Sequence, residues 1–326
     1  MKIPARDLVL GIDSSNYTSS VALANAARGV EADLREALPV KRGERGLRQS
    51  EAFFRHIDRI PALAGALVRA HRGRIGAVAV SEKPRPETNS YMPVFRAGLR
   101  LAELLSDALD APLFCFSHQE GHIRAALQGA GAELCGRFLA WHISGGTSEL
   151  LLAEDGGARL SIVGGSKDIS FGQLLDRVGV ALGMDFPAGA ALDALATAAP
   201  QTGGADENAA RVRLTRIPAD GLFCNLSGME TQCMRAARGG VSAAALSYAI
   251  FENIADCLLR IGADAARAHG ARELLFTGGV SAAACLRRRI SAAPQGTGPM
   301  PIFGDAALSC DNAVGIALLG VEKLWP

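Results

Sequence analysis

Two segments of the chain share one pattern, in which an apolar strand, a short polar turn and a second apolar strand follow one another. The first segment is LVLGIDSSNYTSSVALA at residues 8–24, and the second is FLAWHISGGTSELLLA at residues 138–153. Apolar runs on both sides of a polar turn are typical of a β-hairpin. The repeat therefore predicts a chain built from two halves, each of which opens on a hairpin.

Apolar periodicity predicts the other elements of the chain. Spacings of three and four residues indicate helices, and short apolar runs between breakers indicate strands. The expected helices cover residues 51–70, 94–109, 118–127, 243–268 and 312–324, and the expected strands cover 75–80, 113–116 and 273–276. The proline-rich stretch 81–93 predicts a rigid loop without a regular element. The polar, non-periodic stretch 201–220 predicts a surface insertion.

Length and composition limit the class of protein. The 326 residues are enough for two domains, and a net charge of +1 excludes a strongly polyanion-binding surface over the whole molecule. Seven cysteines without a Cys-x-x-Cys pair are typical of reduced thiols rather than of a disulfide framework. The first residues lack the apolar core of a secretory signal, and no apolar run has transmembrane length. We therefore expect a cytoplasmic protein.

Glycine turns follow strands in the second half. Ser144-Gly145-Gly146 joins the strands of the second hairpin, and Gly278-Gly279 follows the strand 273–276. Backbone N–H groups in such turns point at phosphate oxygens, and glycine lets the backbone approach them closely. With the first hairpin, these turns predict an α/β protein of the actin/sugar-kinase/Hsp70-like (ASKHA) fold, with two lobes and a nucleotide cleft between them. We expect an N-terminal lobe of residues 1–114, completed by the C-terminal helix in 302–326, and a C-terminal lobe of residues 115–301.

A pair of histidines marks a candidate metal site. His118 and His122 are four residues apart, so they share one face of the expected helix and could hold one ion. Glu120 is about 200° around the helix from His118, so the spacing is not that of a zinc protease and Glu120 is a poor general base. An isolated pair would be interpreted as two ordinary helical histidines. Asp311, in a polar turn that opens the last helix, would supply a carboxylate and leave coordination positions open.

With these motifs in place, the chain resembles the tRNA threonylcarbamoyladenosine synthase family, formerly called glycoproteases or O-sialoglycoprotein endopeptidases. The resemblance covers nearly the whole length. The segments that carry it are GIDSSNYTSSVAL, SHQEGHIRAAL, HISGGTSELLL, DISFGQLLDRVGVALGMDFPAG, LSGMETQ, TGGVSAAACLR and SCDNAVGIALLG. It implies the ASKHA fold and supplies the step that spacing alone does not, namely that Asp311 lies beside the two histidines.

The resemblance also implies a role for each residue that matches a family motif. His118, His122 and Asp311 match ligands of one divalent metal ion, Fe²⁺ or Zn²⁺. The residues that match an adenylate or ATP-type nucleotide site are His142, Ile143, Ser144, Gly145, Gly146, Asp176, Gly189, Gly278 and Gly279. Among these, Asp176 matches the residue that binds the ribose hydroxyls. Asp13 is the one candidate for a catalytic side chain.

Several positions depart from the family pattern. Tyr17 and Thr18 replace an acidic pair, Thr147 a histidine, and Gln173 a glutamate, while Glu230 replaces a lysine and Ala283 an asparagine. The loop at 81–96 also differs. Because the metal and nucleotide positions are retained while polar groups around the reacting centre change, the pattern suits a divergent paralogue at least as well as a direct orthologue.

The expected function is metal-dependent transfer of a threonylcarbamoyl group from threonylcarbamoyl-adenylate to N6 of an adenosine in the anticodon loop of tRNA. Two alternatives stay open: carbamoyl transfer from carbamoyl-adenylate to another acceptor, and a non-catalytic nucleotide-binding scaffold. Peptidase activity is the least favoured, because no nucleophile–base pair is present. We expect small helper proteins of the same pathway. Candidate RNA contacts are Lys41, Arg42, Arg45, Arg48 and Arg85.

Overall fold

The computed structural model describes residues 6–15, 17–40, 46–130, 134, 136–198, 212–294, 296 and 298–326. The chain divides into two compact units. The first comprises Met1–Val40, Leu47–Ala132 and Asp311–Pro326, and the second comprises Lys41–Gly46 and Glu133–Cys310. The predicted lobes, 1–114 with 302–326 and 115–301, stay a prediction, because compactness alone does not show which segments fold or move as one body.

The first unit contains a five-stranded sheet in the order β3-β2-β1-β4-β5. Its strands are β1 (Leu8–Asp13), β2 (Thr18–Asn25), β3 (Val30–Ala37), β4 (Ile75–Lys83) and β5 (Leu113–Ser117). Its helices are α1 (Gln49–His71), α2 (Phe95–Leu109), α3 (His118–Ala130) and α9 (Val314–Leu324). β1 pairs antiparallel with β2 and parallel with β4, so the predicted first hairpin is confirmed and β1 is a central strand.

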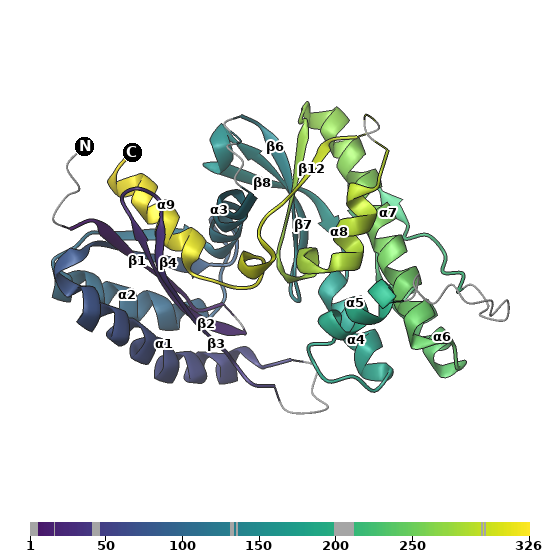
Figure 1. Ribbon diagram of the computed structural model, residues 1–326, viewed down its shortest axis with the longest axis horizontal. Coiled ribbons are helices and arrows are strands. Elements are labelled where there is room, and N and C mark those ends of the chain that lie inside the picture. The colour runs from purple at the N-terminus through teal and green to yellow at the C-terminus, as the bar shows by residue number, and fades with distance from the viewer. Residues whose placement is uncertain are drawn as a thin grey trace. The chain divides into compact units, whose positions relative to one another are not determined.

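The two faces of β1 explain why its sequence is apolar throughout. Leu10 and Ile12 belong to the core beneath α1 and α2, whereas Gly11 points the opposite way, toward α9. A Cβ on Gly11 would lie 2.7 Å from the carbonyl oxygen of Ala313. Successive residues of a strand face opposite sides, so a strand covered on both faces needs apolar or small residues at every position. Figure 1 shows α1 and α2 along one face of this sheet and α9 on the other.

The second unit contains a seven-stranded sheet in the order β12-β11-β6-β7-β8-β10-β9. Its strands are β6 (Phe138–Ile143), β7 (Ser148–Glu154), β8 (Arg159–Ser166), β9 (Ala219–Asp220), β10 (Phe223–Cys224), β11 (Glu273–Thr277) and β12 (Met300–Phe303). Its helices are α4 (Phe171–Ala181), α5 (Gly189–Ala198), α6 (Ser227–Arg238), α7 (Ala243–His269) and α8 (Ala284–Ser291). β6 and β7 form the predicted second hairpin, with His142 opposite Glu149. Within the described residues, short 3₁₀ helices are present at Arg72–Arg74, Asp155–Gly157, Gly279–Ala282 and Ala306–Leu308.

The long helix α7 organises the core of the second unit. Eleven of its residues are buried, and Trp141 of β6 donates from Nε1 to the carbonyl oxygen of Leu258 at 3.1 Å. A buried indole needs a partner for its N–H, so this bond fixes the sheet against the helix while the ring fills the core. Among the described residues, no helix combines the length and the apolar character that a membrane crossing requires.

Two sequence expectations need correction. The prediction that a rigid loop begins at residue 81 is wrong, because β4 continues through Lys83 and stops only before Pro84. The prediction of a surface insertion over 201–220 is wrong for its described part, residues 212–220. Ile217 is buried in the core of the second unit, and Ala219 and Asp220 form β9. A polar segment without periodicity can still contribute one buried apolar side chain to a core. The polar composition of 201–220 therefore led to the wrong prediction for this part.

Helices α3 and α9 cross at very short range. A Cβ placed on Gly315 of α9 would lie 1.8 Å from the carbonyl oxygen of Gly121 of α3. Only glycine at position 315 permits this approach, because the space that a methyl group would need is filled by the backbone of the other helix. The crossing brings the histidines of α3 near the turn that precedes α9.

We predict that Gly315→Ala destabilises the protein, because the added methyl group must push the two helices apart. The free energy of unfolding should fall by about 1–3 kcal/mol, although alanine is the better helix former. Urea unfolding followed by circular dichroism measures the change. Gly73→Ala is the matched control, since a Cβ there meets no atom within 4 Å. Equal stability of the two variants would contradict the inferred packing.

Candidate functional site

The two histidines lie in the first turns of α3, where the helix is capped by its own sequence. The backbone N–H of Ser117 donates to Oε2 of Glu120 at 2.6 Å, and the backbone N–H of Glu120 donates to Oγ of Ser117 at 3.2 Å. This reciprocal pair is a capping box, which fixes the start of the helix. Glu120 therefore serves the cap, in agreement with the expectation that it is no general base for the histidines.

The structure brings His118, His122 and Asp311 together, and all three belong to the first unit. Nε2 of His118 and Nε2 of His122 are 3.0 Å apart. Oδ1 of Asp311 is 3.5 Å from Nε2 of His118 and 3.4 Å from Nε2 of His122. Three candidate donor atoms thus form a nearly equilateral triangle.

The dimensions of this triangle fit one transition-metal ion. Two donors at about 2.1 Å from an ion, separated by octahedral or tetrahedral angles, would be about 3.0–3.4 Å apart. The observed separations of 3.0–3.5 Å need little adjustment. His122 is buried, whereas the side chains of His118 and Asp311 are 13% and 21% exposed. Two imidazoles and one carboxylate suit Fe²⁺ or Zn²⁺ and leave positions open for a ligand.

Asp13 holds His118 in the orientation that such a site requires. Its Oδ2 is 2.7 Å from Nδ1 of His118, and its Oδ1 accepts from the backbone N–H of Ser15 at 2.8 Å. A carboxylate on Nδ1 favours the tautomer with the proton on Nδ1, which leaves the lone pair on Nε2 for a metal. Asp13 is fully buried at the end of β1. Its contact is with a candidate ligand, and its expected role as a catalytic side chain stays a prediction.

The electrostatics of the group favour one positive charge among the carboxylates. Burial opposes the charged form of His118, but Asp13 and Asp311 outweigh it and raise the pKa of His118 to about 10. Burial, followed by the charge of His118, lowers the pKa of His122. Burial opposes the ionisation of Asp311, yet hydrogen bonds to His118 and His122 hold the pKa of Asp311 well below its usual range. Two carboxylates removed from bulk water need a compensating cation nearby.

The turn that carries Asp311 is fixed to the sheet of the first unit. Oγ of Ser20, in β2, accepts from the backbone N–H of Ala313 at 2.8 Å. Oδ1 of Asn312 accepts from the backbone N–H of Val314 at 3.0 Å and so begins α9. Ser20 and Ala313 are 293 residues apart, and no local pattern in the sequence pointed to Ser20. The one feature that could have pointed to Ser20 is its position in β2 directly opposite Asp13.

In the second unit, the predicted glycine turn joins β6 to β7. The backbone N–H of Ser144 donates to the carbonyl oxygen of Thr147 at 2.8 Å, and the backbone N–H of Thr147 donates to Oγ of Ser144 at 3.1 Å. A Cβ placed on Gly145 or Gly146 would meet no atom within 4 Å. The two glycines therefore border open space, which is what the close approach of an anionic ligand to the backbone requires.

The start of α4 is built onto this turn. Oγ of Ser170 donates to the carbonyl oxygen of Gly145 at 2.7 Å, and Oγ of Ser148 accepts from the backbone N–H of Phe171 at 2.8 Å. A Cβ on Gly172 would lie 2.4 Å from the carbonyl oxygen of Ser144. The positive end of α4 thus lies directly beside the glycine turn, an arrangement that attracts anions.

Gly278 lies next to the same turn. β11 pairs with β6 so that Thr277 is opposite His142. Gly278 follows with a φ of 89°, and a Cβ on it would lie 2.4 Å from the carbonyl oxygen of Ile143. Position 278 therefore requires glycine for its conformation and for the close approach. The predicted residues 142–146 and 278 are neighbours in the structure.

Asp176 and Gly189 occupy the approach to α5. Oδ1 of Asp176 accepts from the backbone N–H of Ala188 at 2.8 Å, and burial raises the pKa of Asp176. Gly189 begins α5, and a Cβ there would meet no atom within 4 Å. Asp176 thus holds the start of α5 through the backbone of Ala188 and Gly189. Its expected role at a ribose stays a prediction.

Two departures from the family pattern have local structural uses. Gln173 completes a capping box at the start of α4, because its backbone N–H donates to Oγ of Ser170 and its side chain accepts from the backbone N–H of Ser170. Glu230 forms an ion pair with Arg177 at 3.0 Å. The reversed charge at position 230 is therefore balanced within the second unit.

The predicted RNA contacts are only partly described. Lys41, Arg42 and Arg45 lie outside the described residues, as does Asn16 at the tip of the first hairpin. Arg48 and Arg85 are exposed. Their role with RNA stays a prediction.

Comparison with known proteins identifies the family. A family model described as tRNA N6-adenosine threonylcarbamoyltransferase (TsaD) matches residues 50–318. Proteins named tRNA N6-adenosine threonylcarbamoyltransferase are similar over nearly the whole chain. One from Burkholderia pseudomallei is 31% identical over 98% of this chain and 93% of its own length, and one from Thermus thermophilus is 29% identical over 98% of each. The chain belongs to the tRNA N6-adenosine threonylcarbamoyltransferase family. The predicted family and its acyltransferase class are confirmed.

Solved structures confirm the ASKHA-type fold. HypF from T. kodakarensis superposes with a TM-score of 0.60 at 14% identity, and the match covers 99% of this chain but only 49% of HypF. Component A of (R)-2-hydroxyglutaryl-CoA dehydratase from Acidaminococcus fermentans superposes with a TM-score of 0.56 at 15% identity, with 97% and 98% of the two chains covered. At these identities the likeness shows the fold alone.

We predict that Asp13→Asn weakens metal binding about 10–100-fold, because an amide no longer fixes the tautomer of His118. His118→Ala should remove most binding while the fold is retained. Competition titration with a chromophoric chelator measures the affinity, and circular dichroism checks the fold. His269→Ala, at the end of α7 in the second unit, is the control for loss of one histidine. Wild-type affinity in the folded His118 variant would contradict the assignment.

Proposed function

We propose that this protein transfers a threonylcarbamoyl group from threonylcarbamoyl-adenylate to N6 of an adenosine in the anticodon loop of tRNA, with one Fe²⁺ or Zn²⁺ ion bound by His118, His122 and Asp311. The observation that carries the proposal is the convergence of these three donors, with Asp13 behind His118, in a member of the tRNA N6-adenosine threonylcarbamoyltransferase family. A cytoplasmic location and helper proteins of the same pathway belong to the proposal.

The first unit would hold the acyl group. A bound ion would act as a Lewis acid and template for the threonylcarbamoyl group. His118 and His122 would fix the ion on the face of α3, and Asp311 would complete the set from the turn before α9. Because Asp13 holds Nδ1 of His118, the imidazole ring would already have the orientation for metal binding before an ion arrives. The partly exposed edges of His118 and Asp311 mark the side from which a ligand would approach.

The second unit would hold the adenylate. N–H groups of the Ser144–Gly146 turn and the positive end of α4 would bind the phosphate and stabilise the charge that develops on the departing AMP. Gly278 would let the nucleoside approach the backbone closely, and the carboxylate of Asp176, in α4, would accept from the ribose hydroxyls. These groups share one unit, so the phosphate and nucleoside contacts would be pre-positioned relative to each other.

A different acceptor is the second candidate function. Glu230, which pairs with Arg177, and Ala283 depart from the family pattern, while the glycine turns at 144–146 and 278–279 are retained. Such changes favour retained adenylate binding with altered transfer, which would suit carbamoyl transfer from carbamoyl-adenylate to another molecule. A non-catalytic nucleotide-binding scaffold would show the same binding with no transfer.

The test is reconstitution with unmodified tRNA, threonine, bicarbonate, ATP and the helper proteins of the pathway. We expect threonylcarbamoyladenosine in the tRNA, detected by mass spectrometry of the nucleosides. Asp176→Ala should weaken adenylate binding, measured by calorimetry, because a ribose acceptor is removed. It should leave metal content unchanged, because Asp176 lies in the other unit.

The outcomes separate the candidates. Tight adenylate binding with no modified tRNA would contradict the proposal and favour another acceptor or a scaffold. Release of a carbamoyl product to a small molecule or a protein would identify the second candidate. Absence of both metal and adenylate binding would contradict the metal-dependent mechanism as a whole.

A further inference from the structure

Two loops that lead to the two candidate binding sites leave the second sheet side by side. The strands β11 and β12 are parallel neighbours, with Phe276 opposite Phe303. β11 runs into the Gly278–Gly279 turn, and β12 runs into residues 304–310, which end directly before Asp311. The carboxyl ends of neighbouring parallel strands share one edge of a sheet, where α/β proteins bind ligands. A group that holds both loops would therefore connect the candidate nucleotide turn with the approach to a candidate metal ligand.

Arg287 of α8 is hydrogen-bonded to both loops. Its Nε donates to the carbonyl oxygen of Ser281 at 2.7 Å, and its Nη2 donates to the carbonyl oxygen of Gly304 at 2.8 Å. Nη2 is also 3.4 Å from Oγ of Ser309. The donors of a guanidinium have fixed positions in one plane. Arg287 therefore holds the loop after β11 and the loop after β12 at a fixed separation.

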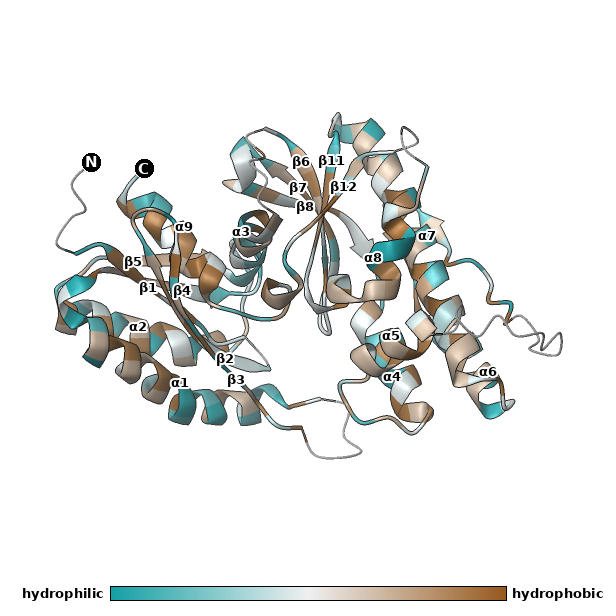
Figure 2. Ribbon diagram, in the orientation of Figure 1, coloured by the Kyte–Doolittle hydropathy of each residue, from teal (hydrophilic) through white to brown (hydrophobic). Residues whose placement is uncertain are grey.

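The guanidinium of Arg287 is itself held in place by an aromatic stack. Its Cζ lies 5.1 Å from the centre of the Phe303 ring, and that ring stacks on Phe276 with the two centres 5.0 Å apart. Figure 2 shows a hydrophilic band on α8, whereas the strands of the sheet beside it are largely hydrophobic. Arg287 is half-buried, and burial lowers the pKa of its guanidinium. Because a charged group in such a place needs stacking and hydrogen bonds, these contacts fix its position.

On the side of the nucleotide turn, Ser281 links Arg287 to Gly278. The backbone N–H and Oγ of Ser281 both donate to the carbonyl oxygen of Gly278, at 2.9 and 2.7 Å. Ser281 is fully buried, and the backbone of Gly278 packs directly on the carbonyl group of Ile143. A displacement of Ser281 would therefore displace the backbone of the turn.

Residues 304–310 form a compact turn rather than an extended loop. Oδ1 of Asp305 accepts a backbone N–H bond at 2.9 Å and so begins the 3₁₀ helix Ala306–Leu308. Oγ of Ser309 donates to the carbonyl oxygen of Asp305 at 3.0 Å and closes the turn, and Ser309 is buried. Arg287 contacts both ends of this turn, so it can set the position of the whole segment.

The segment 304–310 ends beside the glycines of the nucleotide turn. A Cβ placed on Gly279 would lie 3.9 Å from Sγ of Cys310, which is ordinary van der Waals contact. Every contact from Arg287 to Cys310 lies within the second unit, and the peptide bond between residues 310 and 311 leads into the first. The order of this segment therefore limits the positions that Asp311 can take.

We propose that Arg287 is a positioning residue that couples nucleotide binding at the Gly278–Gly279 turn to metal binding by Asp311. A nucleotide on the turn would order residues 278–282, and Arg287 would transmit this order to residues 304–310. Asp311 would then lose less conformational freedom when it binds an ion, so each ligand would raise the affinity of the other. The inference rests on the proposed function, because it requires both the adenylate and the metal ion.

Zn²⁺ and AMP serve as the two probes, and the full chain is used. Competition with a chromophoric chelator measures the Zn²⁺ affinity with and without saturating AMP. Calorimetry measures the AMP affinity with and without Zn²⁺. We expect each ligand to tighten the binding of the other by the same factor, about five- to tenfold, because coupling between two sites is reciprocal.

Substitution of Arg287 should abolish the coupling. Arg287→Met keeps an unbranched side chain but no donor, so the coupling factor should fall to about one. Arg287→Lys keeps the charge, but a single ammonium does not reproduce the planar pair of donors, so the factor should fall here as well. A merely structural role would lower stability or both affinities while the factor stayed the same. Circular dichroism checks the fold of each variant.

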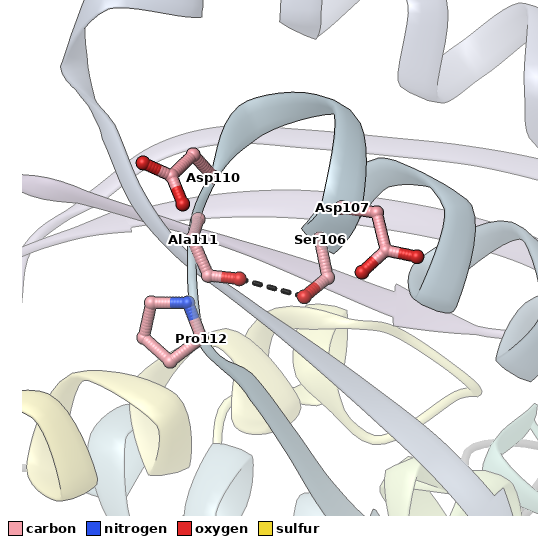
Figure 3. Close-up of a pocket in the computed structure, with 5 residues that line it drawn as sticks. All are labelled: Ser106, Asp107, Asp110, Ala111 and Pro112. Carbon is pink, nitrogen blue, oxygen red and sulfur yellow. Dashed lines mark hydrogen bonds between the residues drawn. The ribbon is translucent and has the colours of Figure 1, made fainter.

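Two controls separate this effect from general changes in charge. Arg289→Met removes an arginine of the same helix together with its ion pair to Glu252 of α7, and it should keep the coupling factor. Asp107 and Asp110 are exposed carboxylates around a pocket at the end of α2, where Zn²⁺ could bind nonspecifically (Figure 3). The double variant Asp107→Asn, Asp110→Asn should leave the Zn²⁺ affinity and the coupling factor unchanged.

Hydrogen–deuterium exchange provides a readout that needs no metal. In the wild type, AMP should slow amide exchange in residues 304–310 as well as in residues 279–282, because Arg287 joins the two segments. In Arg287→Met, AMP should slow exchange in residues 279–282 alone.

The outcomes distinguish this inference from the proposed function. Binding of both ligands without any mutual effect would overturn the inference, while the proposed function would stand. A coupling factor unchanged in both Arg287 variants would overturn it as well, because the coupling would then come from direct contact between nucleotide and ion. Failure of either ligand to bind would overturn the inference and the proposed function together.

Discussion

The crossing of α3 and α9 is the constraint on which the candidate metal centre depends. The carbonyl oxygen of Gly121 occupies the space that a side chain at Gly315 would fill, so the two helices touch through their backbones. Because α3 carries the histidines and α9 follows Asp311 directly, this contact joins ligands that are far apart in the chain. The sheet is packed equally closely at Gly11, because the absence of a side chain there lets the start of α9 lie directly on β1.

The charges of the site follow from the same packing. Asp13 is placed at the end of a fully buried strand, where an ionised carboxylate is costly unless hydrogen bonds and a cation compensate it. The backbone of Ser15 and the ring of His118 supply the hydrogen bonds. The fold thus stabilises a group of two carboxylates and two imidazoles that is suited to a cation. The second unit is suited to an anion instead, because the backbone N–H groups of its glycine turn and the positive end of α4 attract negative charge.

Much of this arrangement could be predicted from sequence because it rests on local patterns. Both hairpins follow from apolar runs on either side of a polar turn, and the shared face of His118 and His122 follows from a spacing of four residues. Asp311 could not be joined to the histidines by spacing, since that contact depends on a helix crossing between distant segments. The resemblance to a family supplied this step.

Other features left no local signal. Ser20 supports the turn before α9 because the fold places β2 beside that turn. The strands β3 and β8 extend their hairpins without a marked apolar pattern in the sequence. Ile217 shows the limit of composition, because one buried side chain in a polar stretch is enough to anchor it to a core. The contact of Asp13 with His118 is revealed only by the three-dimensional arrangement, and a role of Asp13 in chemistry stays a prediction.

X-ray absorption spectroscopy of the protein loaded with one equivalent of Zn²⁺ tests the central claim most directly. The account predicts a first shell of nitrogen and oxygen atoms at about 2.0–2.2 Å, with the outer-shell scattering of two imidazole rings. The signal of one ring should disappear in His122→Ala. A first shell containing sulfur at about 2.3 Å, or a spectrum unchanged by His122→Ala, would contradict the assignment of the ion to His118, His122 and Asp311.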